Sequence, residues 1–451
     1  MNSHRIAAGV AGLAAALTCA GASFASSGPS SSDAPYVVPS KPGVVTKSIL
    51  SVGDSVDGYR MVGIPDGLGA YDNGNGTFTL LMNHELRRTQ GITRAHGDKG
   101  AFVSKWTIDK KTLEVEKGED LIQHLHLTSG PTALERLCSA DLPSYSAFFN
   151  ADTGNGYDGR IFTDGEETGG GRAFAHVATG PEAGESYQLP ALGAGEWENI
   201  VANGSTGDKT VVVGTEDATP GEVIVYQGQK QSTGTAAGKA GLTNGVAKAV
   251  AVNGIGLESS PDGIPSGTHF SLANTDSGTG FLRPEDAAWD VEDPNVLYFV
   301  TTNAIDAPSR LYRLTFDDVS NPALGGTIDM LLDGSEGQRM LDNITVSRRG
   351  QLILQEDPGN NARLARVYRY YPDSDKLVEA AHHDAGLFTP ATPAGPAFIT
   401  QDEESSGVID VSAILGDGWF LLDDQVHKTV SDPELVERGQ LLALHIPPGQ
   451  K

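Results

Sequence analysis

The residues Phe78-Thr79-Leu80-Leu81-Met82-Asn83-His84-Glu85 join a short apolar run to three polar side chains. A short apolar run of this kind, with alternating apolar positions, predicts a β-strand rather than a helix. The strand would end by presenting an amide, an imidazole and a carboxylate together, a combination that packing does not require. The stretch therefore predicts an all-β chain whose strands deliver polar side chains to a functional site.

The same pattern, an apolar strand beside acids or amides, returns along the whole chain. The further instances are Gly165-Glu166-Glu167, Trp197-Glu198-Asn199, Gly214-Thr215-Glu216-Asp217, Arg283-Pro284-Glu285-Asp286, Thr301-Thr302-Asn303, Asp342-Asn343, Gln355-Glu356-Asp357 and Asp423-Asp424-Gln425-Val426-His427. A β-propeller gathers the first strand of every blade around a central channel. A β-sandwich would not bring so many strand ends to one place. The pattern therefore predicts a β-propeller with a metal site in its central channel.

Composition agrees with many short strands. The 451 residues include 56 Gly and 24 Pro, which favour tight turns between strands over long helices. Strands are predicted at Gly76–Met82, Phe102–Asp109, Arg160–Thr163, Thr210–Thr215, Glu222–Gln227, Val296–Thr302, Ser309–Phe316, Gly350–Gln355, Ala365–Tyr371 and Gly418–Asp423. Two loop insertions are predicted, at Gln229–Leu257, with a short helix near Gly241–Val252, and at Glu379–Ile399. We find no internal domain boundary.

The N-terminal residues predict export. A weakly basic start (His4, Arg5) precedes the apolar run from Ile6 to Ala22, and Ser23-Phe24-Ala25 is a small-x-small cleavage motif. We expect residues 1–25 to be a signal peptide cleaved near Ala25, residues 26–41 a Ser/Pro-rich leader, and residues 42–451 a single propeller domain. The protein would then be secreted and extracellular.

The charge of the chain limits its partners. A formal net charge of −26 argues against nucleic acid and against anionic membranes. We expect a monomer that binds neither. Some of the acids, those at strand ends, are candidate ligands for a hard cation such as calcium. Once the signal peptide is removed, Cys138 is the single cysteine of the chain, so it is a buried apolar residue, an intermolecular link or a metal ligand.

Several of these motifs, in their order and spacing, resemble the secreted PhoX-type alkaline phosphatases. The resemblance extends from about Leu68 to His427. It rests on Asn83-His84-Glu85, Cys138 followed by Gly165-Glu166-Glu167, Gly171-Arg172-Ala173-Phe174-Ala175-His176, Trp197-Glu198-Asn199, Glu216-Asp217, Arg283-Pro284-Glu285, Thr302-Asn303, Asp342-Asn343, Glu356-Asp357 and Gln425-Val426-His427. It implies a six-bladed propeller that holds calcium and iron in its channel and hydrolyses small phosphate esters.

The resemblance also implies roles for particular residues. Arg283, Cys138 and Glu198 would be catalytic, and Arg283 would bind the substrate phosphate together with Asn83 and His84. The implied metal ligands are Glu85, Cys138, Glu166, Glu167, Glu198, Glu216, Glu285, Asn303, Asp342 and Glu356. The sequence leaves the roles of His382, His383 and His427 open.

The chemistry of these residues agrees with the implied activity. Clustered carboxylates raise one another's pKa and remain ionised together only beside cations. Oxygen ligands suit calcium, whereas a thiolate adds a position suited to iron. Phosphoryl transfer needs positive charge around the phosphoryl oxygens, and an arginine fork can hold two of them. A metal-dependent phosphomonoesterase is therefore the predicted function.

Two alternatives remain at the level of sequence. One is a noncatalytic propeller that binds calcium for structural reasons, and the other is a calcium-dependent, lactonase-like hydrolase. Neither has a use for Cys138, and a structural calcium site has no use for Arg283 either.

Overall fold

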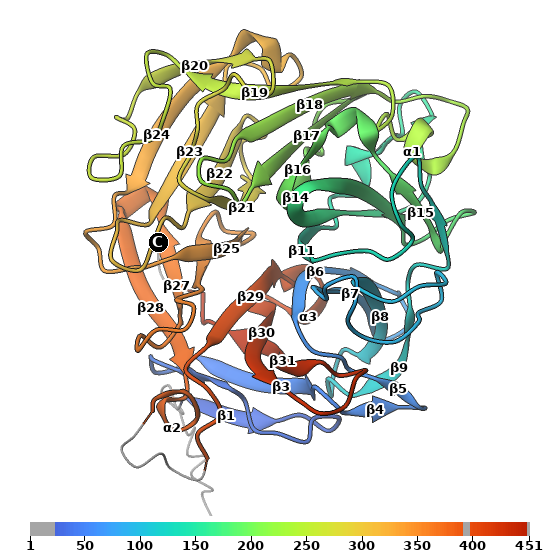
Figure 1. Cartoon of the computed structure of the whole chain (residues 1–451), viewed down its shortest axis with the longest axis vertical. Coiled ribbons are helices and arrows are strands. Elements are labelled where there is room, and N and C mark those ends of the chain that lie inside the picture. The colour runs from blue at the N-terminus through green and yellow to red at the C-terminus, as the bar shows by residue number, and fades with distance from the viewer. Residues whose placement is uncertain (1–22, 391–396, 449–451) are drawn as a thin grey trace, which may run out of the picture.

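The chain folds into sheets that surround a common centre (Figure 1). This computed structural model describes residues 23–390 and 397–448, so the apolar run of the predicted signal peptide lies outside the described residues. The described α-helices are short, at α1 (Ala236–Lys239), α2 (Ala385–Phe388) and α3 (Ser412–Leu415). None of the described helices has the length and apolar character needed to cross a bilayer.

The first half of the chain forms three sets of strands, and each set begins with the strand nearest the centre. The first set is β6 (Pro65–Asp72), β7 (Thr77–His84), β8 (Phe102–Asp109) and β9 (Val115–Asp120). The second is β11 (Leu137–Asp141), β14 (Ile161–Val177), β15 (Glu185–Gln188) and β10 (His124–His126). The third is β16 (Ala194–Ala202), β17 (Lys209–Glu216), β18 (Val223–Gln229) and β19 (Val246–Val252).

The second half of the chain repeats this arrangement. One set is β21 (Pro284–Trp289), β22 (Val296–Thr301), β23 (Arg310–Phe316) and β24 (Gly326–Leu332), with β20 (Thr268–Ala273) between β24 and β19. The next is β25 (Leu341–Val346), β26 (Leu352–Glu356), β27 (Arg366–Tyr371), β28 (Lys376–His383) and β2 (Val37–Pro39). The last is β29 (Glu403–Asp410), β30 (Trp419–Thr429), β31 (Glu437–His445), β3 (Val45–Ser51) and β1 (Phe24–Ser27). Two small hairpins lie outside these sets, β4 (Ser55–Val56) with β5 (Tyr59–Arg60) and β12 (Phe149–Asn150) with β13 (Asn155–Gly156).

The innermost strands close a ring. Going round the centre, β6 contacts β11, which contacts β16, followed by β21, β25 and β29, and β29 contacts β6 again. This closed ring of inner strands, with the other strands of each set outside it, is a β-propeller, as the sequence predicts. The predicted number of six blades stays a prediction, because β14 and β20 each pair with strands of two neighbouring sets.

N-terminal strands complete the last sheets. β3 pairs with β31 near the C-terminus, and β1 adds to β3 in parallel, with Phe24 opposite Val45. β2 pairs with β28. Parts of residues 24–41 therefore lie in sheet edges. The polar side chain of Gln440 holds this segment, because its Oε1 accepts from the Tyr36 amide at 2.8 Å and its Nε2 donates to the Ala34 carbonyl at 3.0 Å.

The hydrophobic core lies between neighbouring sheets. One face of β7 packs Phe78 and Leu80 against Leu421 of β30, and Leu81 on its other face packs near Phe162 of β14. A strand buried on both faces needs apolar residues at nearly every position, which explains the run Phe78–Met82. Of the polar residues that end this run, Asn83 and His84 are buried and Glu85 reaches the centre.

The predicted strands all overlap observed ones, but none of the innermost strands is among them. The helix predicted near Gly241–Val252 is wrong, because residues 246–252 form β19 and the helix of this insertion is α1 at Ala236–Lys239. Val246, Val250 and Val252 favour a strand, and pairing of this run on both sides outweighs the high helical propensity of its alanines. The second predicted insertion begins inside β28, while its residues 391–396 lie outside the described residues.

Candidate metal centre

Each strand of the inner ring delivers one acid or thiol to the centre, in most cases from its second residue. These side chains are all buried, at 9% exposure or less. They are Asp66 of β6, Cys138 of β11, Glu198 of β16, Glu285 of β21, Asp342 of β25 and Glu404 of β29. Because the inner strands start at the same end of the channel, equivalent positions in six sets converge on one place.

Three groups of these side chains have the spacing of a metal site, with ligand atoms within 4.8 Å of one another. The groups are Asp66, Glu85 and Cys138; Cys138, Glu167 and Glu198; and Glu198, Glu285 and Asp342. Cys138 and Glu198 each belong to two groups. The groups therefore form one continuous cluster, which we call the acid cluster.

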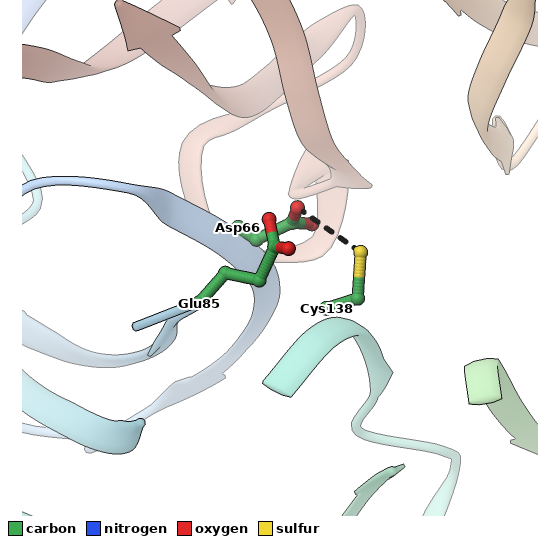
Figure 2. Close-up of side chains that lie close together, drawn as sticks. All are labelled: Asp66, Glu85 and Cys138. Atoms are coloured by element: carbon green, nitrogen blue, oxygen red, sulfur yellow. Dashed lines mark hydrogen bonds between the residues drawn. The ribbon is translucent and has the colours of Figure 1, made fainter. Parts of the chain in front are cut away.

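Figure 2 shows the first of these groups, with Glu85 reaching towards Asp66 and Cys138. The Cys138 thiol donates to Asp66 Oδ2 at 3.5 Å, as drawn. Gln425 Nε2 also donates to Asp66 Oδ2, at 2.7 Å, and to Glu85 Oε2, at 3.1 Å. These bonds fix the two carboxylates, but they leave most of the negative charge of the cluster uncompensated.

Two arginines flank the acid cluster. Arg136 binds Glu85 Oε1 through Nε at 2.5 Å and also binds Glu167. Arg283 binds both oxygens of Asp217, at 2.7 and 2.8 Å, and its Nη2 lies 3.0 Å from Glu285 Oε1. The side chains of both arginines are about one-third exposed, at 32% and 28%. Among the described residues, Nη1 of each guanidinium has no hydrogen-bond partner, so both forks have donors left for a ligand.

Burial opposes ionisation of the acid cluster. Burial is the main cause that raises the pKa of Glu198 from 4.5 to about 8. It also raises the pKa of Asp66, Glu285 and Asp342 well above the ordinary range, and the neighbouring carboxylates add to each shift. The pKa of the Cys138 thiol is raised for the same two reasons. Without a cation, protons must neutralise part of this cluster.

The donor set fits metal ions. Glu198 Oε1 and Gln425 Oε1 are buried oxygens to which no described residue donates a hydrogen bond. A buried acceptor left in this way costs free energy unless a proton or a cation meets it. Carboxylate and amide oxygens are the ligands that calcium prefers, and a thiolate beside them suits iron. The residues of the acid cluster could therefore hold one or more such ions.

The structure brings six of the predicted metal ligands together and leaves four outside. The six in the acid cluster are Glu85, Cys138, Glu167, Glu198, Glu285 and Asp342. Glu166 instead forms an ion pair with Arg172, and Glu356 forms one with Arg363. Glu216 accepts from the Glu222 amide at 3.1 Å, and Asn303 donates to the Pro308 carbonyl at 3.1 Å. All four side chains have partners in their own loops or sheets.

The predicted substrate ligands are also divided. Arg283 lies beside the acid cluster. Asn83 is fully buried, and its Nδ2 donates to the Cys138 carbonyl at 2.7 Å, so it positions the backbone of the thiol residue. His84 is fully buried on Phe102, with 4.3 Å between ring centroids, and its Nε2 lies 2.9 Å from Ser104 Oγ. His84 therefore lies in the core, where it cannot contact a substrate.

Several residues of this centre are absent from the predicted set. Asp66 follows a proline and precedes a glycine, and Pro-Asp-Gly is the usual signature of a turn. Arg136 stands two positions before Cys138, with no motif of its own. Asp217 and Asp357 directly follow Glu216 and Glu356, the residues predicted instead. The signal for Glu404 is the acidic pair Glu403-Glu404, which begins β29.

The three histidines left open by the sequence have different surroundings. His383 is buried against Asp424 Oδ1 at 2.9 Å, and that carboxylate raises the pKa of His383 to about 9 in spite of burial. His382 lies 2.6 Å from Ser40 Oγ near the surface. His427 lies between Glu437, at 2.8 Å, and Glu404, at 3.5 Å.

A pocket of about 250 Å³ opens next to the acid cluster, and a larger cavity of about 670 Å³ lies along the inner strands further from it. The smaller pocket includes Glu85 and Arg136 among its lining residues, together with Glu404 and His427. It therefore gives a solute a path to the first group of the cluster.

Comparisons with known proteins bear on the fold alone. No protein-family model and no curated protein sequence matches this chain. Among solved structures, it is similar to Pseudomonas fluorescens PhoX in complex with vanadate, a transition-state analogue, with a TM-score of 0.58 and 11% identity over 89% of this chain and 95% of that one. The NanB sialidase of Streptococcus pneumoniae matches with a TM-score of 0.41 and 9% identity, over 88% of this chain and 70% of that one. The similarity to PhoX supports the propeller architecture.

Proposed function

We propose that this protein is a metal-dependent phosphomonoesterase. The observation that carries the proposal is the acid cluster with a thiol at its centre and two arginine forks beside it, next to a pocket. A purely structural ion site needs neither the thiol nor the partly exposed arginines. Following the predicted export signal, the enzyme would act outside the cell on small phosphate esters.

The acid cluster is the place for the metal ions. Glu85, Glu198, Glu285 and Asp342 would hold calcium through their carboxylates, and Cys138 would add a thiolate for iron. When bound, these ions would supply the positive charge that phosphoryl transfer requires. Their presence would also keep the buried carboxylates ionised, because an adjacent cation lowers a carboxylate pKa.

The arginines would bind and orient the phosphate. Arg136 is held by Glu85 and Glu167, and Arg283 by Asp217 and Glu285. These acids fix both guanidiniums before a ligand arrives, so little side-chain entropy is lost on binding. Charge-assisted hydrogen bonds from Nη1 of each arginine would hold phosphate oxygens at the edge of the acid cluster.

The test is phosphate release from nitrophenyl phosphate by the purified protein, with calcium and ferric iron supplied and then with a chelator. The proposal expects turnover that the chelator abolishes and that added metal restores. Vanadate should inhibit, because its trigonal-bipyramidal complexes resemble the transition state of phosphoryl transfer. A metal-loaded protein that releases no phosphate would exclude the phosphomonoesterase, and metal binding alone would then favour the noncatalytic propeller.

A further inference from the structure

The smaller pocket, which Arg136 helps to line, lies next to the acid cluster, where part of a substrate could bind. Glu85 and Arg136 belong both to the wall of this pocket and to the acid cluster and its flanking arginines. A phosphate held by Arg136 would therefore have the pocket on one side and the acid cluster on the other. The group esterified to that phosphate would then have room in the pocket.

The wall of this pocket is almost entirely polar. Ile64 is the single aliphatic residue among those that line it. Arg87 is exposed, and its side chain has no hydrogen bond or ion pair with any residue that the structure describes. Gln90 Oε1 accepts from the Arg87 amide at 2.8 Å, while its Nε2 is left without a partner among the described residues.

The pocket wall also offers acceptors. Glu437 Oε2 is bound by His427 Nδ1 at 2.8 Å, and Glu437 Oε1 has no donor within the described part of the chain. Asp357 lies in the same wall. Donors from Arg87 and Gln90 and acceptors from Glu437 and Asp357 thus line the same space of about 250 Å³.

We infer that this pocket receives the alcohol part of the ester and selects small hydroxylated alcohols, namely polyols and monosaccharides. The inference rests on the proposed phosphomonoesterase function. Hydroxyl groups both donate and accept, so they can satisfy the donors and the acceptors of one polar wall at once. An aryl or alkyl group would displace water from these polar groups and return no hydrogen bonds.

The size of the pocket agrees with a small alcohol. Pockets for drug-sized ligands measure roughly 300–1,000 Å³. A volume of about 250 Å³ accommodates a glycerol or hexose unit, whereas a nucleoside or a lipid would extend out of it.

The experiment compares kcat/KM for glycerol phosphate and for nitrophenyl phosphate in the metal-loaded protein. An aryl leaving group is intrinsically better, so the informative quantity is the change of each kcat/KM on substitution. Arg87→Leu and Gln90→Leu remove polar groups from the wall and leave the acid cluster and both flanking arginines intact. Arg348→Leu is the matched control, because Arg348 is an exposed arginine that lines the other, larger cavity.

We expect each pocket variant to lower kcat/KM for glycerol phosphate about tenfold, the usual effect of one lost hydrogen bond in a site. The value for nitrophenyl phosphate should stay within about twofold or rise, and Arg348→Leu should change neither. If the wild type hydrolyses both esters but the pocket variants change them equally, the pocket does not select the alcohol. If Arg348→Leu alone changes the ratio, the alcohol lies in the larger cavity. If the wild type hydrolyses neither ester, the proposed function itself is wrong.

Discussion

Glu198 and Glu166 are both buried glutamates, but their surroundings give them opposite effects on stability. Glu166 faces Arg172 with two hydrogen bonds, at 2.6 and 2.7 Å, so its charge is compensated within the protein. Glu198 has no arginine partner among the residues that the structure describes, and burial raises its pKa to about 8. A buried carboxylate without a cationic partner in the protein stabilises the fold only when it binds a ligand such as a metal ion.

The first prediction therefore compares Glu198→Gln with Glu166→Gln. Glu198→Gln should raise the melting temperature of the chelated protein, because a neutral amide is cheaper to bury. It should lower both the bound metal and kcat/KM for nitrophenyl phosphate by at least about tenfold. Glu166→Gln breaks a buried ion pair and should cost about 3 kcal/mol of unfolding free energy while the metal content stays unchanged. Urea unfolding, elemental analysis and initial rates measure these effects, and equal metal loss in both variants would contradict the assignment.

Cys138 tests whether iron is present. A thiolate bound to ferric iron should give a visible charge-transfer absorption, and Cys138→Ser should remove it together with most of the activity. The pKa of this buried thiol is raised in the metal-free protein, so thiol reagents should react with it only after unfolding. A colourless preparation that hydrolyses phosphate esters with calcium alone would discard iron and retain the phosphatase.

At the scale of strands, the side chains of two adjacent acidic residues point in opposite directions, so only one of the two reaches the centre. Glu216 is the last residue of β17 and Glu356 the last of β26, and each is followed by an aspartate. Successive side chains of a strand point to opposite faces. The aspartates Asp217 and Asp357 therefore reach the centre, while the glutamates before them bind groups on their own sheets.

This alternation predicts a difference between Asp217→Asn and Glu216→Gln. Asp217 receives both Nε and Nη2 of Arg283, so its amide variant should loosen that fork. We expect Asp217→Asn to raise KM for the phosphate ester about tenfold, the effect of one weakened charge-assisted contact. Glu216→Gln should leave KM within about twofold. If both variants have the same KM, Asp217 does not orient Arg283 for substrate.

At the scale of the whole molecule, the six inner strands place five acids and a thiol at one point, and a ligand must balance their charge. In the metal-free protein the pKa of Glu198 is about 8 when folded, against 4.5 ordinarily. Between these values the folded chain binds more protons than the unfolded chain. Its unfolding free energy must then fall as the pH rises.

The fourth prediction follows from this decrease of the unfolding free energy with rising pH. With a chelator present, the melting temperature should decrease from about pH 5 to about pH 8, over the interval set by the two pKa values of Glu198. With calcium in excess the decrease should be smaller, and the stabilisation by calcium should be greatest at pH 8, where binding displaces fewest protons. Calorimetry at both pH values, with and without calcium, measures the difference. A chelated protein that is as stable at pH 8 as at pH 5 would contradict the buried acid cluster.

The sequence by itself determined the all-β class, ten of the strands outside the inner ring and most of the acid cluster. The alternation of apolar residues in a strand is a local property of the sequence. An acid that follows an apolar run such as Phe78–Met82 can therefore be recognised without knowing which residues it contacts in the fold. The inner strands escaped prediction, because the ligands and glycines that line a channel remove the apolar alternation that marks a strand, as in Pro65-Asp66-Gly67.

Only the tertiary structure decided which polar residues meet. The sequence around Asp66 is typical of a turn, and Arg136 belongs to no recognisable motif. His84 has the sequence context of a ligand, although packing on Phe102 places it in the core. Glu166 and Glu167 are adjacent in sequence, but Glu166 is paired with Arg172 and Glu167 belongs to the acid cluster. The physical reason is that convergence at the channel depends on the direction of each side chain and on strands far apart in sequence. Neither is encoded in a local pattern.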